Sequence, residues 1–322
     1  MEGNTVKCEK TKETFRKPKY KKNNLLKKFK FSWQFHLMIL PGMLLIIVFC
    51  YLPMYGVIIA FKDFVPNKGI LGSAWVGLKW FDYMFQLPDV WLVTKNTFII
   101  AGLKILLGFP VPIIFALLLN EVRRGWLKKG IQTIVYLPNF LSWVILAGLI
   151  LDVFALNNGL VNQFITWLGF KPLYFLGDNQ YFRGLLIGTD IWKNFGWGTV
   201  IYMAALTGVD TALYEAAVID GANRWKQTLY VTLPAIVPII LLSGILSLGN
   251  VLNAGFEQIF NLYNPLVMQS GDIIDTYVYR LAFMDANWSL STAVGLLKSF
   301  VSTIFVCTGY WLAFKFTDYK IF

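Results

Sequence analysis

The chain has 322 residues, of which 57% are hydrophobic and only 15% are charged. Soluble domains average about 25% charged residues. A folded soluble monomer of this length buries only about three quarters of its surface, so the apolar excess indicates lipid as the solvent. The formal net charge of +11 is concentrated in residues 1–30, which hold 11 Lys and Arg and 3 Glu; this distribution argues against nucleic acid as a partner.

Few residues are available for metal or disulfide chemistry. Cys8, Cys50 and Cys307 lie far apart without a CxxC pair, and His36 is the only histidine. This excludes a disulfide framework, a zinc site and most histidine-dependent catalysis. The first apolar run begins near Leu37 and is long enough to span a membrane, so we expect no cleaved signal peptide.

Residues 1–30 form a basic arm directly before that apolar run. Such an arm is typical of a cytoplasmic flank that meets anionic lipid headgroups. A disordered tail without a specific partner is the alternative, and the two are compatible. We take residues 31–322 as one six-helix transmembrane domain.

Six stretches reach the roughly 20 apolar residues that a helix needs to cross a bilayer. They cover residues 37–60, 96–119, 131–154, 184–206, 233–254 and 293–313. Gly184 and Gly188 form a GxxxG pattern, which predicts close helix packing at the start of the fourth span.

The positive-inside rule sets the orientation. With the N-terminus inside, 19 Lys and Arg fall in inner segments and six in outer loops. This imbalance predicts that both chain ends are cytoplasmic.

The inner loop at residues 208–232, between spans four and five, is the most informative segment. Asp210 is suited to cap a first short helix. Asp220 and Gly221 supply a turn, since Gly accepts positive φ. Leu233 and Pro234 predict a break before the next span.

The same loop carries features of a docking surface. Small residues, large aromatic residues and one acid occur together: Ala216, Ala217, Tyr214, Trp225, Tyr230 and Glu215. An exposed helix pair of this kind is suited to a groove in another protein. An amphipathic loop lying on the membrane is the alternative from pattern alone.

Glu215-Ala216-Ala217, Gly221 and Val231-x-Leu233-Pro234 stand at the spacing of the EAA signature. The chain thereby resembles the permeases of binding-protein-dependent ABC importers, which usually have Ile where Val231 stands. Within that family it is most similar to the carbohydrate-uptake branch, especially the polysaccharide-type (LplB-like) permeases.

This resemblance implies an all-α, type I ABC importer transmembrane domain in the bacterial cell membrane. It implies that Glu215, Ala216, Ala217, Asp220, Gly221, Leu233 and Pro234 couple the chain to a separate ATPase. The implied partners are two ATPase subunits, a second permease as heterodimer, an extracellular solute-binding protein and an oligosaccharide. A homodimer is not excluded by the sequence.

The chain itself is expected to bind no cofactor, with ATP and Mg held by the ATPase partner. Gly125 and Gly130 have the spacing of a phosphate loop. Ile131 and Gln132 stand where that loop requires Lys and Ser or Thr. We therefore expect a transport subunit rather than an enzyme.

Polar residues inside spans mark candidates for the substrate pathway. Asn250 and Asn253, three residues apart, are expected to share a helix face, with Ser247 near it and Glu257 at the outer mouth. The resemblance adds that the maltose transporter has an Asn pair of equal spacing, offset by one residue from its EAA glutamate.

The fourth span offers a second set of candidates: Trp192, Lys193, Asn194 and Trp197. The alternative for these is helix–helix hydrogen bonding with core aromatic rings.

Three lysines fall inside predicted spans: Lys104, Lys193 and Lys298. A basic cavity would attract acidic oligosaccharides. Snorkelling or pairing with a partner subunit is the alternative. The first hypothesis predicts that Lys193→Met weakens uptake of acidic sugar more than neutral sugar.

Two other classes of membrane protein are alternatives to an importer permease. An ion-coupled carrier predicts acids at membrane depth, where only Asp152 and Asp190 come near. A membrane-embedded enzyme predicts a His, Asp or Cys cluster there, and the sequence has none. A permease for another small solute stays open, since the sequence does not name the sugar.

Overall fold

The computed structural model describes residues 25–316, which fall into two units divided between Gly56 and Val57. Most of the described chain is helical, as the sequence predicts. The second of these units, called the main unit, carries every candidate site residue.

The N-terminal unit consists of α1 (Leu25–Ile46) and a five-residue π segment (Ile47–Tyr51). The Leu52 N–H closes the π segment on the carbonyl of Ile47. Pro53 follows at once and has no N–H to donate. The wider π turn therefore lets the helix continue into a 3₁₀ segment (Leu52–Phe61) ahead of the main unit.

The main unit begins with a small hairpin and continues with helices. The strands β1 (Lys62–Asp63) and β2 (Ala74–Trp75) pair antiparallel, Lys62 opposite Trp75. The remaining helices are α2 (Gly69–Gly72), α3 (Lys79–Gln86), α4 (Pro88–Gly108), α5 (Pro110–Asn120), α6 (Gly125–Phe140), α7 (Trp143–Val153), α8 (Leu160–Trp167), α9 (Asn179–Thr207), α10 (Thr211–Ile219), α11 (Arg224–Gln227), α12 (Leu233–Leu248), α13 (Phe256–Leu262), α14 (Met268–Gly271), α15 (Ile274–Phe283) and α16 (Trp288–Phe316).

Four helical stretches within residues 25–316 are long and apolar enough to cross a bilayer. They are Trp33–Phe61, Pro88–Asn120, Arg224–Leu248 and Trp288–Leu312, which confirm predicted spans one, two, five and six as apolar helices. Helix α9 covers the predicted fourth span, but it is less apolar because Arg183, Asp190 and Lys193 interrupt it. The count of six spans stays a prediction.

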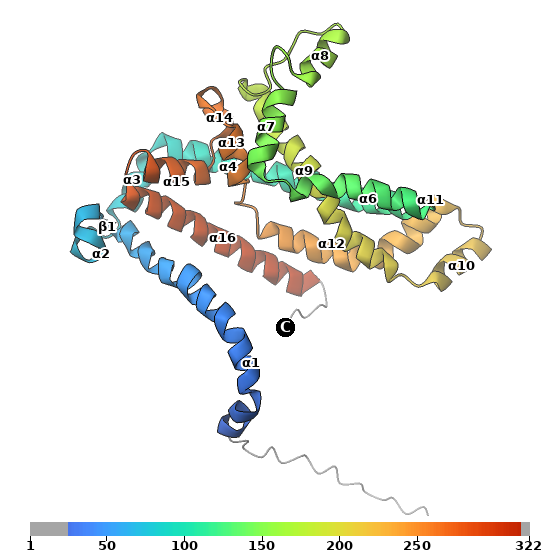
Figure 1. Cartoon of the computed structure of the whole chain (residues 1–322), viewed down its shortest axis with the longest axis horizontal. Helices are drawn as coiled ribbons and strands as arrows, with labels where there is room; N and C mark the ends of the chain where they lie inside the picture. The colour runs from blue at the N-terminus through green and yellow to red at the C-terminus, as the bar shows by residue number, and fades with distance from the viewer. Residues whose placement is uncertain (1–24, 317–322) are drawn as a thin grey trace, which may run out of the picture. The chain divides into compact units, whose positions relative to one another are not determined.

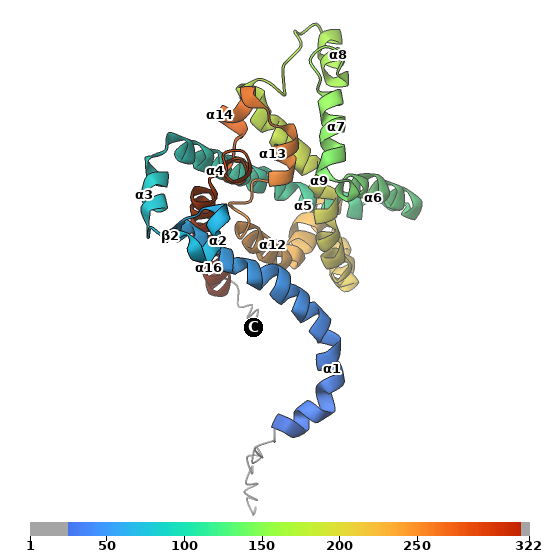
Figure 2. The same ribbon diagram turned by 60° about the vertical axis from the view of Figure 1, so that its left-hand side comes forward.

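The predicted third span is not one straight helix. Helices α6 and α7 meet at a bend of 104°. Pro138 lies in the last turn of α6, and Ser142 caps α7 by accepting from the Ile145 N–H at 3.4 Å. The helical direction changes here because Leu141 and Ser142 are extended. Beyond α7, the short helix α8 lies away from α12 in both Figure 1 and Figure 2.

Helix α9 is the centre of the packing. It contacts α4, α5, α6 and α12 along its length. One buried apolar cluster joins α9 to α4, α7 and α13, and a second joins it to α5 and α12. A third cluster joins α3 and α4 to α15 and α16.

Close packing along α9 does not occur at the predicted GxxxG pattern. A Cβ placed on Gly184 or Gly188 would meet no atom within 4 Å, so this prediction is wrong within the chain. A Cβ on Gly196 would instead lie 2.3 Å from the Val135 carbonyl oxygen of α6. The tight helix crossing therefore lies three turns further along α9.

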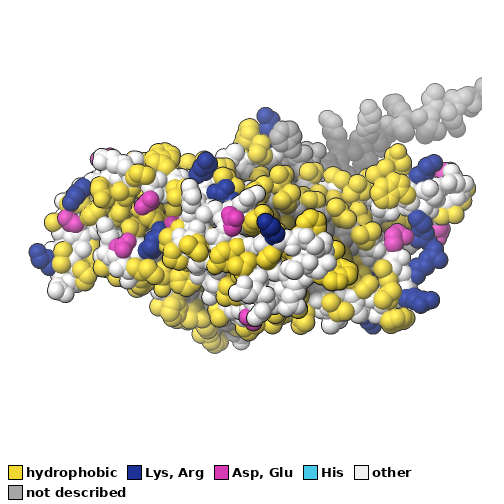
Figure 3. All heavy atoms as spheres, turned by 90° about the horizontal axis from the view of Figure 1, so that it is seen from above, with side chains coloured by type: hydrophobic (Ala, Val, Ile, Leu, Met, Phe, Trp, Pro, Cys, Tyr) yellow, Lys and Arg dark blue, Asp and Glu magenta, His cyan; other side chains and the backbone are white. Residues whose placement is uncertain are grey.

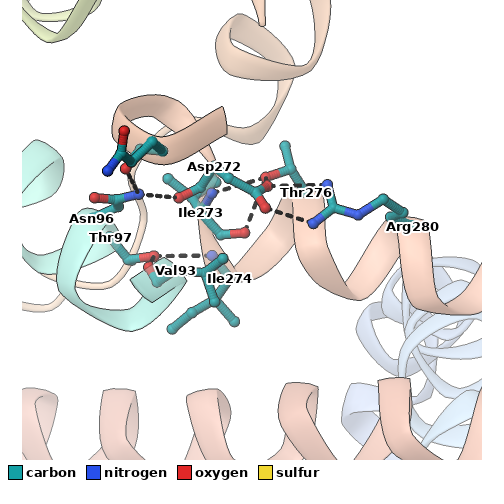
Figure 4. Close-up of polar contacts among 9 residues, drawn as sticks. Val93, Asn96, Thr97, Asp272, Ile273, Ile274, Thr276 and Arg280 are labelled. Atoms are coloured by element: carbon teal, nitrogen blue, oxygen red, sulfur yellow. Dashed lines mark hydrogen bonds and ion pairs between the residues drawn. The ribbon is translucent and has the colours of Figure 1, made fainter. Parts of the chain in front are cut away.

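Polar bonds hold the α14–α15 segment against α4 (Figure 4). The Asn96 amide donates to the Asp272 carbonyl at 3.0 Å, and Thr97 accepts from the Ile274 N–H at 2.9 Å. The Asp272 carboxylate lies 2.6 Å from Arg280. Burial lowers the pKa of Arg280, but the hydrogen bond and charge of Asp272 outweigh it, so that pKa is raised.

Candidate functional site

Helices α10 and α11 form a bent pair at one end of the main unit (Figure 1). The Asp210 carboxylate accepts from the Ala212 N–H at 2.9 Å and caps α10, as predicted. Gly221 has φ +74°, a left-handed conformation that favours glycine. Asn223 caps α11 by accepting from the Lys226 N–H at 2.9 Å. Local residues thus determine where α10 and α11 begin and where the chain turns between them.

Further bonds hold the pair together. The Tyr214 and Thr232 hydroxyls lie 2.9 Å apart and link α10 to the helix after α11. The Gln227 amide donates to the Ala222 carbonyl at 2.8 Å across the turn. These contacts favour a bent pair that moves as one piece.

The outer face of the pair is exposed. Ile219 and Trp225 expose 86% and 73% of their surface, and Glu215 is exposed in the middle of α10. The Glu215 side chain makes no hydrogen bond or ion pair with any residue of the described chain. Tyr214, predicted as a large aromatic residue of the docking surface, is half-buried, because its hydroxyl faces Thr232.

Lys and Arg side chains gather at the same end of the main unit, as Figure 3 shows. The turn after α5 reaches the pair through Arg224, whose guanidinium lies 3.4 Å from the Glu121 carboxylate. Both side chains are largely exposed, so the ion pair adds at most about 1 kcal/mol. The ion pair shows that the loop after α5 and the loop that holds α10 and α11, both predicted to be inner loops, are in contact.

The predicted break at Leu233 and Pro234 does not occur. A continuous helix runs over Arg224–Leu248. A π segment (Thr228–Thr232) precedes Pro234, and the Leu233 N–H bonds to the Thr228 carbonyl. The widened turn accommodates the ring of Pro234, as at Pro53, so α11 and α12 are joined in one rod. Motion of the pair would pass directly into α12.

The expected shared helix face of Asn250 and Asn253 is wrong. Helix α12 ends at Leu248, and both asparagines lie in successive turns after it. The Asn253 N–H bonds to the Asn250 carbonyl at 2.8 Å. Both side chains are exposed, whereas Ser247 is turned back onto the Gly244 carbonyl at 2.6 Å.

Glu257 follows in the first turn of α13 and is exposed. Its neighbour Gln258 is fully buried. The Gln258 amide donates to the Leu186 carbonyl and the Thr189 hydroxyl of α9, at 2.7 and 2.8 Å. Adjacent polar residues here have opposite environments.

The candidates on α9 divide between two places. Trp192 lines an apolar cavity of about 550 Å³ between α7 and α9, which Gly184 and Gly188 also line. Asn194 and Trp197 face the end of α6, where Asn139 donates to the Asn194 amide oxygen at 3.3 Å and Phe140 meets the Trp197 ring.

Lys193 lies at the α6–α7 bend and is buried. Its ammonium group donates to the carbonyls of Pro138, Asn139 and Leu141 and lies 5.2 Å from the Trp143 ring centroid. A cation at the end of α6 complements the helix dipole. The position of Lys193 therefore favours a structural role over substrate contact.

The other two span lysines are paired inside the chain, which sequence patterns missed. Lys104 lies 3.1 Å from Asp190, and Lys298 lies 2.5 Å from Asp275. The acid partners come from other helices, so no spacing rule along one helix could find them. The expected pairing with a partner subunit is not needed for either lysine.

The comparisons with known proteins cover nearly the whole chain. Residues 108–317 match the family described as "Binding-protein-dependent transport system inner membrane component". The polygalacturonan/rhamnogalacturonan transport system permease protein YteP of Bacillus subtilis (strain 168) is 44% identical over 304 residues, covering 94% of this chain and 95% of that protein. Protein LplB of the same organism is 42% identical, covering 89% and 90%.

A solved structure has the same architecture. It is a chain of a bacterial ABC transporter involved in the import of the acidic polysaccharide alginate, with a TM-score of 0.84 and 38% identity over 91% of this chain and 99% of that one. A second structure of a bacterial alginate ABC transporter, in complex with an alginate pentasaccharide-bound periplasmic protein, also has a TM-score of 0.84, at 37% identity.

Proposed function

The chain belongs to the family of binding-protein-dependent transport system inner membrane components, and on that premise we propose how it works. It is a multi-pass permease subunit of an ATP-driven importer. We propose that α10 and α11 receive the motion of a separate ATPase and pass it to α12. The membrane helices would then alternate between inward-open and outward-open states.

The exposed surface of the α10–α11 pair is the observation that supports this proposal. Glu215 and Trp225 stand in the open, while Asp210, Tyr214 and Thr232 hold the pair from within. A helix pair that internal hydrogen bonds hold in shape, and whose exposed side chains are available for bonding, is suited to docking in a groove. Glu215 would accept a charge-assisted hydrogen bond there.

The energy would come from the partner, so we propose that ATP and Mg are bound by the ATPase and not by this chain. The proposed assembly contains two ATPase subunits, a second permease and an extracellular solute-binding protein. The alginate transporter solved with a periplasmic protein supports the last of these.

We propose that the substrate is an oligosaccharide released from an acidic polysaccharide. The names of the relatives carry this step: polygalacturonan, rhamnogalacturonan and alginate. These polymers share chains of pyranose rings that bear carboxylates.

The test is uptake by the whole importer in proteoliposomes, with trigalacturonate as the probe and ATP inside. Glu215→Ala and Gly221→Val should each abolish ATP-dependent uptake and reduce copurification of the ATPase. The Gly221 substitution acts because a β-branched residue at φ +74° is strained.

Asp82→Asn on α3 is the matched control, since it neutralises another exposed acid. It should leave uptake unchanged. Uptake that proceeds without ATP, or full coupling in both loop variants, would contradict the proposed function.

A further inference from the structure

A second pocket, which combines polar and apolar side chains, lies where α12 ends, between α13, α15 and α16. Its volume is about 500 Å³, within the range of small-ligand pockets, about 300–1,000 Å³. Its lining consists of Gly249, Leu252, Asn253, Phe256, Asp275, Val278, Tyr279, Ala282, Phe283, Lys298 and Ser302.

Helix α15 contributes one complete face to this pocket. Asp275, Val278, Tyr279, Ala282 and Phe283 follow the i, i+3, i+4, i+7, i+8 spacing that places side chains on one side of a helix. The acid thus stands at the start of the face, and the two aromatic rings follow it. The face combines polar and flat apolar surface in sequence.

The polar groups of the pocket keep unused hydrogen-bonding capacity. Lys298 and Asp275 are 2.5 Å apart, with 20% and 25% of their side chains exposed. An ammonium group has three donors, and Asp275 is the one acceptor that Lys298 meets in the described chain. The Asn253 side chain likewise bonds to no described residue.

A row of aromatic rings leads past the pocket. The ring centroids of Tyr263 and Phe260 are 6.3 Å apart, those of Phe260 and Tyr279 are 4.8 Å apart, and those of Tyr279 and Phe283 are 4.9 Å apart. Phe256 lies beside this row, 5.9 Å from Tyr279. The row joins α13 to α15.

The row continues to the start of α16, where the Phe283 and Trp288 centroids are 5.4 Å apart. Phe283 exposes 66% of its surface. Rings from three elements therefore form one connected surface along which a flat apolar group would find successive contacts.

We propose that this pocket and its ring row bind pyranose units of the transported oligosaccharide. The C–H face of a pyranose would pack on Tyr279 and Phe283. Its hydroxyls would bond to Asn253, Lys298 and Asp275. The proposal rests on the proposed function and adds a location and a mode of recognition to it.

The pocket fits a sugar better than a lipid chain. An acyl chain would leave the further donors of Lys298 and the remaining acceptor sites of Asp275 without partners, which costs free energy. The cavity at Trp192 has the opposite character, since nearly all of its lining is apolar. The Lys298–Asp275 pair carries no net charge. The site would therefore recognise the ring and hydroxyls of a sugar and would not select for the carboxylate of a uronic acid.

The experiment is isothermal titration of the permease–ATPase complex in nanodiscs, without the binding protein. Trigalacturonate and uncharged galactotriose are the two probes. Wild type should bind both with comparable affinity. Tyr279→Leu and Asn253→Ala should each weaken binding of both sugars by about tenfold, the size of one lost contact.

Asn253→Ala protects the test against misfolding, since that side chain has no bond within the described residues to lose. Phe164→Leu on α8 is the matched control for ring removal, because its ring stacks on Trp167 outside the row. It should bind like wild type.

Unchanged affinity in Tyr279→Leu and Asn253→Ala, or wild-type binding of the acid alone, would overturn the site. If ATP-driven uptake is unchanged in these variants, the proposed function stands, but the pocket does not take part in transport. Wild-type importer whose uptake in proteoliposomes does not depend on ATP would refute the proposed function itself.

Discussion

The ammonium group of Lys104 on α4 lies 3.1 Å from the carboxylate of Asp190 on α9, with 8% and 23% of the two side chains exposed. Lys104 also donates to the Gln258 amide oxygen at 2.5 Å and to the Ala254 carbonyl at 2.8 Å. Its three donors thereby join two long helices to the segment between α12 and α13. Ala254 directly follows Asn253 in the chain, so this junction holds the end of the turns that contain Asn250 and Asn253.

Lys104→Met should destabilise the protein by about 3–5 kcal/mol, because it leaves the Asp190 charge without its partner. The double variant Lys104→Met/Asp190→Leu should lose less, since both charges are then absent. Thermal unfolding of the purified permease in detergent measures the difference. A double variant as unstable as the single one would contradict the ion pair as the cause.

Gly196→Ala should destabilise the α6–α9 crossing by about 1–3 kcal/mol through overpacking. The new methyl group would lie 2.3 Å from the Val135 carbonyl oxygen, and backbone cannot move aside cheaply. Gly184→Ala on the same helix has open space around it and should unfold at the wild-type temperature or slightly above. Equal melting temperatures for the two variants would refute close packing at Gly196.

Lys193→Met should lower stability and reduce uptake of trigalacturonate and of galactotriose to the same extent. The reason is that the ammonium group of Lys193 is buried and donates to carbonyls at the end of α6. Melting temperature and uptake in proteoliposomes, read together, decide this. A loss of trigalacturonate uptake alone, at unchanged melting temperature, would instead support the hypothesis that Lys193 attracts acidic oligosaccharides by its charge.

Asp210→Ala should loosen the first turn of α10 by about 0.5–2 kcal/mol, the usual cost of a lost N-cap. Hydrogen exchange of the amides at residues 211–214 should become faster. Asp210→Asn keeps a capping oxygen and should exchange like wild type. Fast exchange in both variants would point to the charge of Asp210 and not to its hydrogen bond with the Ala212 N–H.

The caps and the turn of the loop at residues 208–232 were predictable because their structure is local. Asp210 bonds two residues ahead, Gly221 needs only its own φ angle, and Asn223 bonds three residues ahead. The continuous helix at Pro234 was missed, because a π turn depends on how the neighbouring helix is held. The inward position of the Tyr214 hydroxyl was missed for the same reason, since its partner Thr232 is 18 residues away.

The sequence by itself determined that the chain is helical, that it lies in a membrane and that a capped pair of short helices with a glycine turn lies between two of its long helices. Apolar length, charge imbalance and local capping carry that information without any distant contact. Only the tertiary structure decided which acids neutralise Lys104 and Lys298, where α12 ends and which rings meet at Tyr279. Those outcomes depend on residues from separate helices, whose proximity is set by packing around α9 and not by spacing along the chain.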